Sequence, residues 1–371
     1  MRVEITEYGQ AHVEEVAEFN RRLRAGGVPS AFPTRPTSEW LPPVPGRRLF
    51  QEQFVALDEE GIVRGGYILK HQDFKLGEEV VDVGDFRLPI SEGTVNRNYA
   101  LVTAQLIAHA FAKNPLLYGL GIGGWNVPAA RMAKASGWLL LEIPFFFRVN
   151  HPARFLHGIP YLRKRWYRRV LLDLAAFTGA GWVGLKAIQT LRKKYRPTER
   201  LSADQVDEFD AWADELWSQC REQYPMIAVR DSKTLRILYP KDDPRFIRLR
   251  VREEGKVVGW CVLLATQFRD HKQFGALKVG SFIDGLASVG DATKVVAAAT
   301  AELDRRAVDL IVSNHSHRDW CAAFDASGYL RGPSNFLFAA SRKLAQRLEA
   351  SEIARDAIYL NRGDGDGPIH L

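Results

Sequence analysis

Acidic residues lie inside apolar stretches at two distant places in the sequence. Asp82 and Asp85 occur in VDVGDF, and Asp284 occurs in SFIDGL. A carboxylate among apolar residues is costly to bury without a partner, which makes these side chains candidates for general acid or base chemistry. Asp284 is the first candidate for a base, and Asp85 is the second. The structural alternative, a carboxylate that bonds nearby backbone amides, stays open for both.

Two histidines follow a later apolar stretch, His315 and His317 in SNHSHRDW. A neutral imidazole can act as a base near neutral pH, so both histidines join the catalytic candidates. Their spacing of two does not suit a metal pair on a helix, and no third ligand is near, so no metal site is expected. Solvated loop histidines are the alternative.

The composition favours two globular domains in a reducing compartment. The chain has 371 residues, of which 46% are hydrophobic and 26% are charged, and this length favours two domains over one. The three cysteines form no CxxC or Cys/His cluster, so neither a disulfide framework nor zinc is expected. The first residues, MRVEITEYGQAHVEEV, lack the apolar run of a signal peptide. We therefore expect a cytoplasmic protein.

The sequence repeats the same order of features in its two halves. The pair Glu60-Gly61 recurs as Glu254-Gly255, 194 positions later (254 minus 60), and ASGW at 135–138 recurs as ASGY, 191 positions later (326 minus 135). A displacement that stays nearly constant over this span indicates duplication. We therefore expect two homologous domains in tandem.

Each half contains the same predicted elements. An amphipathic helix comes first, a β-hairpin forms around the acidic-glycine turn, and a further strand leads into a long helix. A buried strand, a short helix ending in Ser-Gly-aromatic and an aromatic-rich last strand complete the half. The expected fold class is mixed α/β (α+β), with a twisted sheet flanked by helices in each domain. The domains are predicted at 1–150 and 201–345, joined by 151–200 and followed by a tail at 346–371.

This order of elements, with Ser-Gly-Trp or Ser-Gly-Tyr before the last strand, resembles the GNAT superfamily of acyl-CoA-dependent N-acyltransferases. Tandem forms, such as the Fem-like transferases and paired-domain proteins of polysaccharide loci, are similar. The resemblance implies that the fourth strand splays from the fifth, that acyl-CoA enters the gap, and that the following helix presents its N-terminus to the pyrophosphate. Helix N-termini favour anions in general. Acetyl-CoA or another acyl-CoA would be the co-substrate.

The family's phosphate loop corresponds to VNRNYA at 95–100 and VGDATKV at 289–295. Both depart from the family pattern, because Asn98 replaces a glycine in the first and no basic residue leads the second. The candidates for holding the cofactor are Arg97, Asn98, Tyr99, Asn126 and Gly290, with an ordinary helix cap as the alternative. The family's reaction needs a base for the ammonium proton, and Asp284 with its two histidines favours the second half as the catalytic one. Arg97 favours the first.

Residues 151–200 carry the positive charge of the chain. They contain twelve Lys and Arg against two acids, a net charge of +10, which leaves 7 minus 10, or −3, for the rest. We expect interdomain helices here or, alternatively, a patch that holds the protein at anionic lipid on the inner face of the membrane. Nucleic acid is not expected, since no nucleic-acid motif accompanies the charge.

The chain ends in NRGDGDGPIHL, which places short acids between glycines. Arg362, Asp364 and Asp366 are candidates for binding substrate, because the arginine could pair with a phosphate or carboxylate. A solvated terminus is the alternative.

The leading hypothesis is an acyl-CoA-dependent N-acyltransferase that acts on an amine, for example an amino sugar of a cell-envelope or exopolysaccharide precursor. A Fem-like transferase that uses aminoacyl-tRNA is one alternative. A protein of this fold that has lost catalysis and binds an anionic nucleotide as a regulator is the other.

Overall fold

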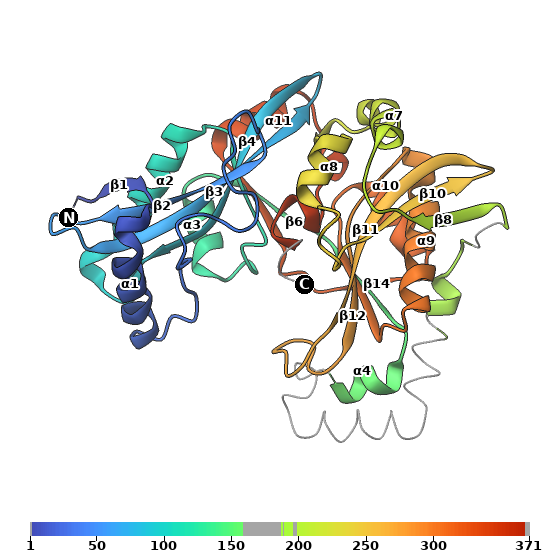
Figure 1. The fold of residues 1–371 in the computed structure, drawn as a ribbon, viewed down its shortest axis with the longest axis horizontal. Helices are drawn as coiled ribbons and strands as arrows, with labels where there is room; N and C mark the ends of the chain where they lie inside the picture. Colours follow the sequence, from blue (N-terminus) through green and yellow to red (C-terminus); the bar gives the residue numbers. More distant parts are fainter. Residues whose placement is uncertain (1, 159–186, 188, 196–198, 368–371) are drawn as a thin grey trace. The chain divides into compact units, whose positions relative to one another are not determined.

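The computed structural model describes residues 2–158, 187, 189–195 and 199–367, which form two compact units (Figure 1). Unit 1 comprises Met1–Leu141 and Leu337–Ile353, and unit 2 comprises Glu142–Phe336 and Ala354–Leu371. Each unit therefore consists of two separate pieces of chain. The predicted division into continuous domains at 1–150 and 201–345 does not follow this arrangement, for a reason that the strand order gives.

Unit 1 is a mixed sheet with the strand order β1-β2-β3-β4-β5-β15-β6. The pairs are antiparallel from β1 to β4 and between β5 and β15, whereas β4 and β5 are parallel. The strands are β1 (Glu4–Glu7), β2 (Phe50–Leu57), β3 (Val63–Leu76), β4 (Glu79–Ser91), β5 (Leu117–Leu120), β6 (Leu139–Glu142) and β15 (Leu337–Ala340). The helices are α1 (Val13–Ala25), α2 (Val102–Lys113), α3 (Pro128–Ala135) and α11 (Arg342–Ala350).

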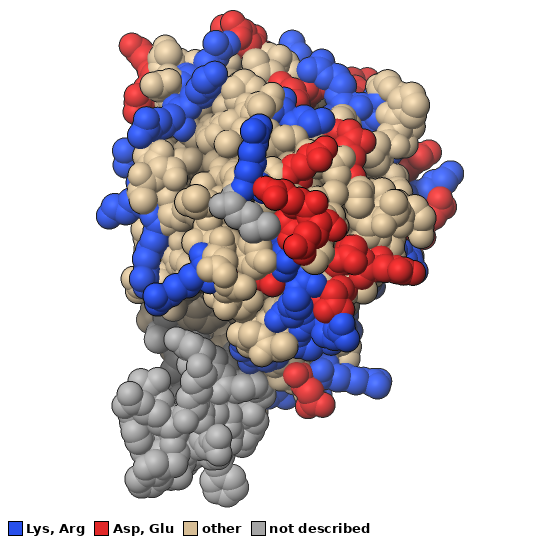
Figure 2. Space-filling model, turned by 90° about the vertical axis from the view of Figure 1, so that its left-hand side faces the viewer, with Lys and Arg blue, Asp and Glu red and all other residues tan. Residues whose placement is uncertain are grey.

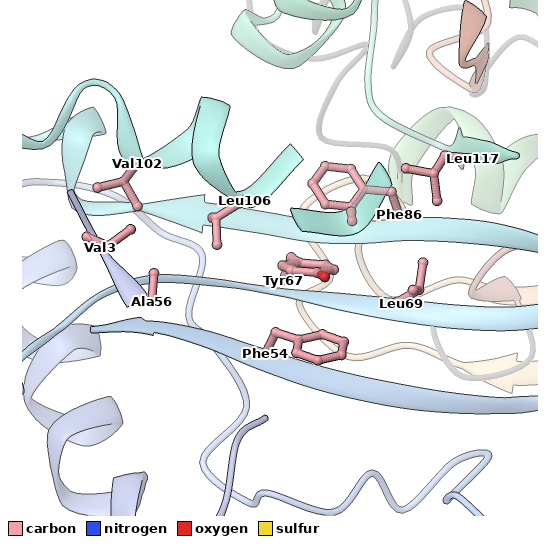
Figure 3. Close-up of a cluster of buried hydrophobic side chains, with 10 residues drawn as sticks. Val3, Phe54, Ala56, Tyr67, Leu69, Phe86, Val102, Leu106 and Leu117 are labelled. Carbon is pink, nitrogen blue, oxygen red and sulfur yellow. The ribbon is translucent and has the colours of Figure 1, made fainter. Parts of the chain in front are cut away.

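Apolar side chains hold one helix on each face of this sheet. Alternate residues of a strand point to opposite faces, so Tyr67 and Leu69 of β3 pack under α2, while Ile68 packs with α1. Figure 3 shows Val102 and Leu106 of α2 above the aromatic and aliphatic side chains of β2 and β3. The sheet is therefore the middle of three layers.

Unit 2 repeats this plan with the strand order β8-β10-β11-β12-β13-β7-β14. Its central pair, β12 and β13, is parallel, and the other pairs are antiparallel. The strands of this sheet are β7 (Phe145–Val149), β8 (Leu201–Gln205), β10 (Ile247–Glu253), β11 (Lys256–Gln267), β12 (Lys278–Ala287), β13 (Leu310–Asn314) and β14 (Leu330–Gly332). The short strand β9 (Met226–Ala228) belongs to the unit but not to this sheet. The helices are α4 (Pro152–Gly158), α7 (Ala211–Cys220), α8 (Ser232–Leu238), α9 (Ala292–Arg305) and α10 (Arg318–Ala326).

The two halves of the chain exchange their last strands. The aromatic-rich strand that ends the first half, β7, lies in the sheet of unit 2 beside β13. The corresponding strand of the second half, β15, lies in the sheet of unit 1 beside β5. The predicted mixed α/β class and the tandem duplication are confirmed. The exchange explains why the boundaries of the units differ from those predicted.

Both predicted hairpins are present at the acidic-glycine turns. Glu253 of β10 pairs with Lys256 of β11, so Glu254 and Gly255 form a two-residue loop. Both loop residues have positive φ, 50° and 82°, as a type I′ turn requires. In unit 1 the turn between β2 and β3 is closed by Asp58, whose Oδ1 accepts hydrogen bonds from the backbone N–H of Glu60 and Ile62.

A partly buried charge cluster links the three long strands of unit 1. His71 of β3 lies between Glu52 of β2 (Nε2 to Oε2, 2.8 Å) and Asp82 of β4 (Nδ1 to Oδ2, 3.1 Å). Burial lowers the pKa of His71, but its hydrogen bonds to Asp82 and Glu52 outweigh this and raise the pKa to about 9. The imidazolium therefore stabilises the sheet.

We predict that His71 titrates near pH 9 in the folded protein, measured by NMR. Because the folded pKa exceeds that of the unfolded chain, about 6.5, this stabilisation is complete below pH 6.5. It is lost as the pH rises through 9, which lowers the free energy of unfolding by up to about 2–3 kcal/mol. His71→Gln should lack this part of the pH dependence in urea unfolding. An unchanged profile in that variant would contradict the assignment.

Candidate active site

In unit 1 the parallel strands β4 and β5 are paired over two residues. Gly84 lies beside Leu117 and Asp85 lies beside Tyr118, although β4 continues to Ser91. The central strands therefore part directly after Asp85, in agreement with the splay that the resemblance implies.

Polar side chains form one row across the sheet at this point. Gln51 of β2 lies opposite Lys70 of β3, Lys70 lies opposite Asp85 of β4, and Asp85 lies beside Tyr118 of β5. Neighbouring residues in register share a face of the sheet. An amide, an ammonium, a carboxylate and a phenol therefore lie side by side where the strands part. All four residues are at most 3% exposed.

Two cations lie next to the carboxylate of this row. Asp85 Oδ2 is 4.0 Å from Lys70 Nζ and 3.8 Å from Arg87 Nε. Both cations also lie over the ring of Trp40, at 5.9 and 5.3 Å from its centre. The row therefore combines a carboxylate that can take a proton with groups that attract negative charge.

The loop before α2 carries the first set of cofactor candidates. Arg97–Tyr99 form one turn of 3-10 helix, in which Arg97 and Asn98 are exposed and Tyr99 stacks under Arg64, 4.3 Å from the ring centre. The N-cap of α2, Leu101, makes no side-chain hydrogen bond, and the first turn of α2 has no acidic residue. Its N-terminal amides are therefore not capped by a side chain or faced by a negative charge from the helix. Asn126 is exposed in the loop after β5.

In unit 2 the corresponding parallel pair is longer. β12 and β13 pair from Val279 with Leu310 to Phe282 with Ser313. A bulge at Ile283 interrupts the pairing of β12 with β11. Asp284 follows this bulge, just beyond the point where β12 and β13 part.

Asp284 is 1% exposed and accepts hydrogen bonds from four groups. Its Oδ1 accepts from Arg230 Nε at 2.9 Å, Asn361 Nδ2 at 2.7 Å and the backbone N–H of Gly285 at 2.8 Å. Its Oδ2 accepts from Tyr239 OH at 2.9 Å. Burial lowers the pKa of Arg230, but the negative charge of Asp284 outweighs burial, so the pKa of Arg230 lies above its ordinary value. Burial raises the pKa of Tyr239. Donors thus surround both oxygens of Asp284.

Asp85 and Asp284 do not occupy equivalent positions. The third strand of each sheet carries a glycine, Gly65 or Gly259, that packs against the first turns of the following long helix. The residue three positions after this glycine pairs with a residue of the fourth strand. That partner is Arg87 of β4 in unit 1 and Asp284 of β12 in unit 2. The duplication therefore places side chains of opposite charge at this position.

Both histidine candidates are buried at the carboxyl end of β13. His315 is 0% exposed and stacks on Trp320, with ring centres 4.9 Å apart. Burial, together with the charges of His317 and Arg230, lowers the pKa of His315 well below 6.5. Burial lowers the pKa of His317 to about 4. Both rings are therefore neutral at pH 7.

The second cofactor loop carries an acid at the start of its helix. Gly290 is exposed in open surroundings, and the next residue, Asp291, is the N-cap of α9. The carboxylate of Asp291 pairs with Lys294 at 2.7 Å. A negative charge thus already lies where an incoming phosphate would bind.

The C-terminal candidates lie in unit 2. Asp364 is 1% exposed and accepts hydrogen bonds from Arg230 Nη2 and from the backbone N–H of Asn361, both at 2.9 Å. Arg362 donates to Asn314 Oδ1 at 3.2 Å, and Asp366 is half-buried. The candidates thus fall into two groups. Unit 1 holds Asp85, Arg97, Asn98, Tyr99 and Asn126, and unit 2 holds Asp284, Gly290, His315, His317, Arg362, Asp364 and Asp366.

The sequence-based reasoning missed Lys70, Tyr118, Arg230 and Tyr239. Arg230 follows the apolar run MIAV at 226–229, which is a weak sign of a buried cation. Its two carboxylate partners are 54 and 134 residues away in the sequence, so no local spacing could reveal them. Tyr118 lies within the apolar strand LLYGL, where a core tyrosine is expected.

The predicted lipid-binding or interdomain role of 151–200 falls largely outside the described residues, which omit 159–186, 188 and 196–198. In the part of the chain that is described, no helix combines the length and apolar character needed to cross a membrane.

No family model and no curated protein matches the sequence. Solved structures match its fold over most of the chain. A probable N-acyltransferase of unknown function from Enterococcus faecalis V583 has a TM-score of 0.52 at 9% identity, covering 93% of this chain and 74% of its own. A tandem GNAT protein from the clavulanic acid biosynthesis pathway has a TM-score of 0.50 at 13% identity, covering 91% and 98%.

The fold is a tandem GNAT fold. Saccharomyces cerevisiae N-myristoyltransferase with bound myristoyl-CoA is similar as well, with a TM-score of 0.50 at 10% identity over 91% of this chain and 82% of its own. In this fold, the parallel strands that part at the centre of each sheet are β4 with β5 in unit 1 and β12 with β13 in unit 2.

We predict that Arg230→Met lowers the free energy of unfolding by about 3–5 kcal/mol, because it leaves the buried carboxylates of Asp284 and Asp364 without their shared cation. Urea unfolding measures the change. Lys233→Met, the same substitution at an exposed position of α8, should change the free energy by less than about 0.5 kcal/mol. Similar losses in the free energy of unfolding in both variants would contradict a stabilising role for the ion pairs of Arg230.

Proposed function

We propose that this protein is an acyl-CoA-dependent N-acyltransferase whose catalytic site lies in unit 1. One observation carries this proposal. The central strands of unit 1 part directly after the pair formed by Asp85 and Tyr118, which places a carboxylate and a phenol on one face at the opening between β4 and β5. These are the two groups that acyl transfer to an amine requires, a base for the amine and an acid for the leaving thiolate.

In this proposal Asp85 receives the proton of the acceptor's ammonium group, directly or through a water molecule. The amine nitrogen then attacks the thioester carbonyl, the nitrogen–carbon bond forms and the carbon–sulfur bond breaks. Tyr118 protonates the departing thiolate and regains a proton from the nitrogen as the amide forms, and Asp85 releases the ammonium proton to solvent. Two protons thus leave nitrogen, one for sulfur and one for water. Lys70 and Arg87 attract negative charge near Asp85 and favour its ionised form.

The cofactor loop of unit 1 supports the same choice. The helix α2 begins without a side-chain cap or an acid in its first turn, so its amides and dipole can attract a phosphate. Arg97, Asn98 and Tyr99 precede it and would hold the pyrophosphate, with Asn126 after β5. In unit 2, Asp291 opposes an anion at the same place, which weakens Gly290 as a cofactor ligand.

The contacts within unit 2 support a structural role for Asp284 and its neighbours. Four donors enclose Asp284, and taking up a proton would cost it at least one of these hydrogen bonds. His315 and His317 are neutral, but His315 is fully buried against Trp320. We therefore place the base in unit 1, although the sequence favours unit 2.

The acceptor is an amine, and we propose an amino sugar of an envelope or exopolysaccharide precursor as the first class to test. A structure similar to this chain contains a GCN5-related glucosamine N-acetyltransferase region, with a TM-score of 0.51 at 13% identity. Glucosamine is therefore a suitable first acceptor in a panel of amines.

We predict that Asp85→Asn lowers kcat by about 10²–10⁴ with any accepted amine, because the ammonium proton loses its base. Release of free CoA thiol from acetyl-CoA measures turnover. Tyr118→Phe should lower kcat as well. Asp284→Asn serves as the matched comparison and should keep its turnover per folded molecule while losing stability. Loss of turnover in Asp284→Asn alone would move the active site to unit 2.

We predict that Arg97→Glu weakens acetyl-CoA binding at least tenfold, because it places a negative charge before the N-terminus of α2. Isothermal titration calorimetry measures the dissociation constant. Arg24→Glu, the same change at an exposed position near the end of α1, is the control and should leave the affinity unchanged. Equal effects of both variants would indicate a general charge effect, and no heat with wild-type protein would remove acyl-CoA as the co-substrate.

A further inference from the structure

The last described residues of the chain are part of the core of unit 2. We call residues 358–364 the C-terminal segment. Ile358, Tyr359, Leu360 and Asn361 are at most 1% exposed, as is Asp364. These residues are therefore part of the packed interior of unit 2.

On one side, the C-terminal segment pairs with β9. Ile358 forms a parallel bridge with Met226, and the backbone N–H of Tyr359 donates to the carbonyl of Met226 at 2.9 Å. On the other side, the C-terminal segment pairs with the residues that follow β13. Asn361 forms an antiparallel bridge with His315, and the N–H of Ser316 donates to the carbonyl of Leu360 at 3.0 Å.

The same segment also contacts β12 beyond the point where β12 and β13 part. The hydroxyl of Tyr359 donates to the carbonyl of Gly285, and the side-chain amide of Asn361 donates to Asp284 Oδ1 at 2.7 Å. Contacts with β12 and with the end of β13 place the segment in the gap between these strands.

The fit in this gap is tight at Gly363. A Cβ added to Gly363 would clash with the hydroxyl of Tyr239 and would lie 2.9 Å from Asp284 Cβ. A side chain larger than that of glycine does not fit at this position, because the backbone of the segment lies close to β12. At this position the segment therefore lies directly against β12 and Tyr239.

Charge fixes the segment in place. Arg230 joins Asp284 of β12 to Asp364 of the segment, with both ion pairs at 2.9 Å and all three side chains 1% exposed. Asp364 also accepts from the N–H of Asn361 at 2.9 Å. Removing the segment would leave Arg230 and Asp284 with fewer partners in a buried site, which is costly.

We propose that the C-terminal segment is the resident ligand of the gap between β12 and β13, so that unit 2 binds no acyl-CoA and each chain binds one acyl-CoA, in unit 1. The consequence for acyl-CoA rests on the proposed function, whereas the occupied gap does not. Unit 2 then has a structural role, and its parted strands β12 and β13 hold the C-terminal segment.

Hydrogen exchange followed by mass spectrometry on the full chain tests the occupied gap. Amides of 358–364 should exchange as slowly as those of β12 and should keep this protection when acetyl-CoA is added. Rapid exchange, or loss of protection with acetyl-CoA, would overturn the proposal.

A matched pair of variants tests the anchor. Asp364→Asn removes one charge partner of Arg230 and should speed exchange in 358–364 at least tenfold. Asp356→Asn makes the same change at a side chain that is 62% exposed and should leave the exchange unchanged. Equal exchange in both variants would contradict the anchoring role. If Asp364→Asn fails to fold, the exchange measured on the wild-type protein decides.

Calorimetric stoichiometry tests the consequence. Wild-type protein should bind one equivalent of acetyl-CoA, and Arg97→Glu should reduce this single class of sites without revealing another. Two equivalents, or binding that persists unchanged in Arg97→Glu, would overturn the assignment of a closed unit 2. No binding by the wild-type protein would instead refute the proposed function, and the exchange experiment would still decide whether the gap is occupied.

Discussion

The parallel strand pair at the centre of each sheet stops pairing before β4 and β12 end, and the rest of the structure is arranged around this break. Backbone N–H and C=O groups beyond such a break lose their partners in the sheet and need new ones. In unit 2 the chain provides them itself, since the C-terminal segment accepts a hydrogen bond from the N–H of Ser316 and donates others to Gly285 and Asp284 of β12. In unit 1 the break comes earlier, after two paired residues. A ligand in that gap would meet the same need.

The exchange of β7 and β15 makes the two halves of the sequence depend on each other. Each strand lies beside the central strand of the other half's sheet, β13 or β5. Neither half therefore contains all the strands of one sheet. Pairs formed between residues far apart in the sequence cost more chain entropy than local hairpins. The buried aromatic residues of these strands offset this cost, as Phe146 does by stacking on Phe324 with ring centres 5.0 Å apart.

The sequence predicts the features that depend on neighbouring residues. The Glu-Gly turns predict both hairpins, because positive φ at Gly255 is a local requirement. Repetition of the same elements predicts the duplication and the fold class. The strand exchange could not be predicted, because the pattern of FFFRV is the same whichever sheet receives it. The surroundings of Asp284 were equally hidden, since its partners Arg230, Tyr239 and Asn361 lie 54, 45 and 77 residues away.

The two acids differ in how their neighbours stabilise the negative charge. Asp284 is held by directed hydrogen bonds of 2.7–2.9 Å, each of which depends on a lone pair that a proton would need. Asp85 lies beside two cations, with its Oδ2 3.8 Å from Arg87 Nε and 4.0 Å from Lys70 Nζ. In the proposed assignment, the same duplicated break supports proton transfer in unit 1 and holds the C-terminal segment in unit 2.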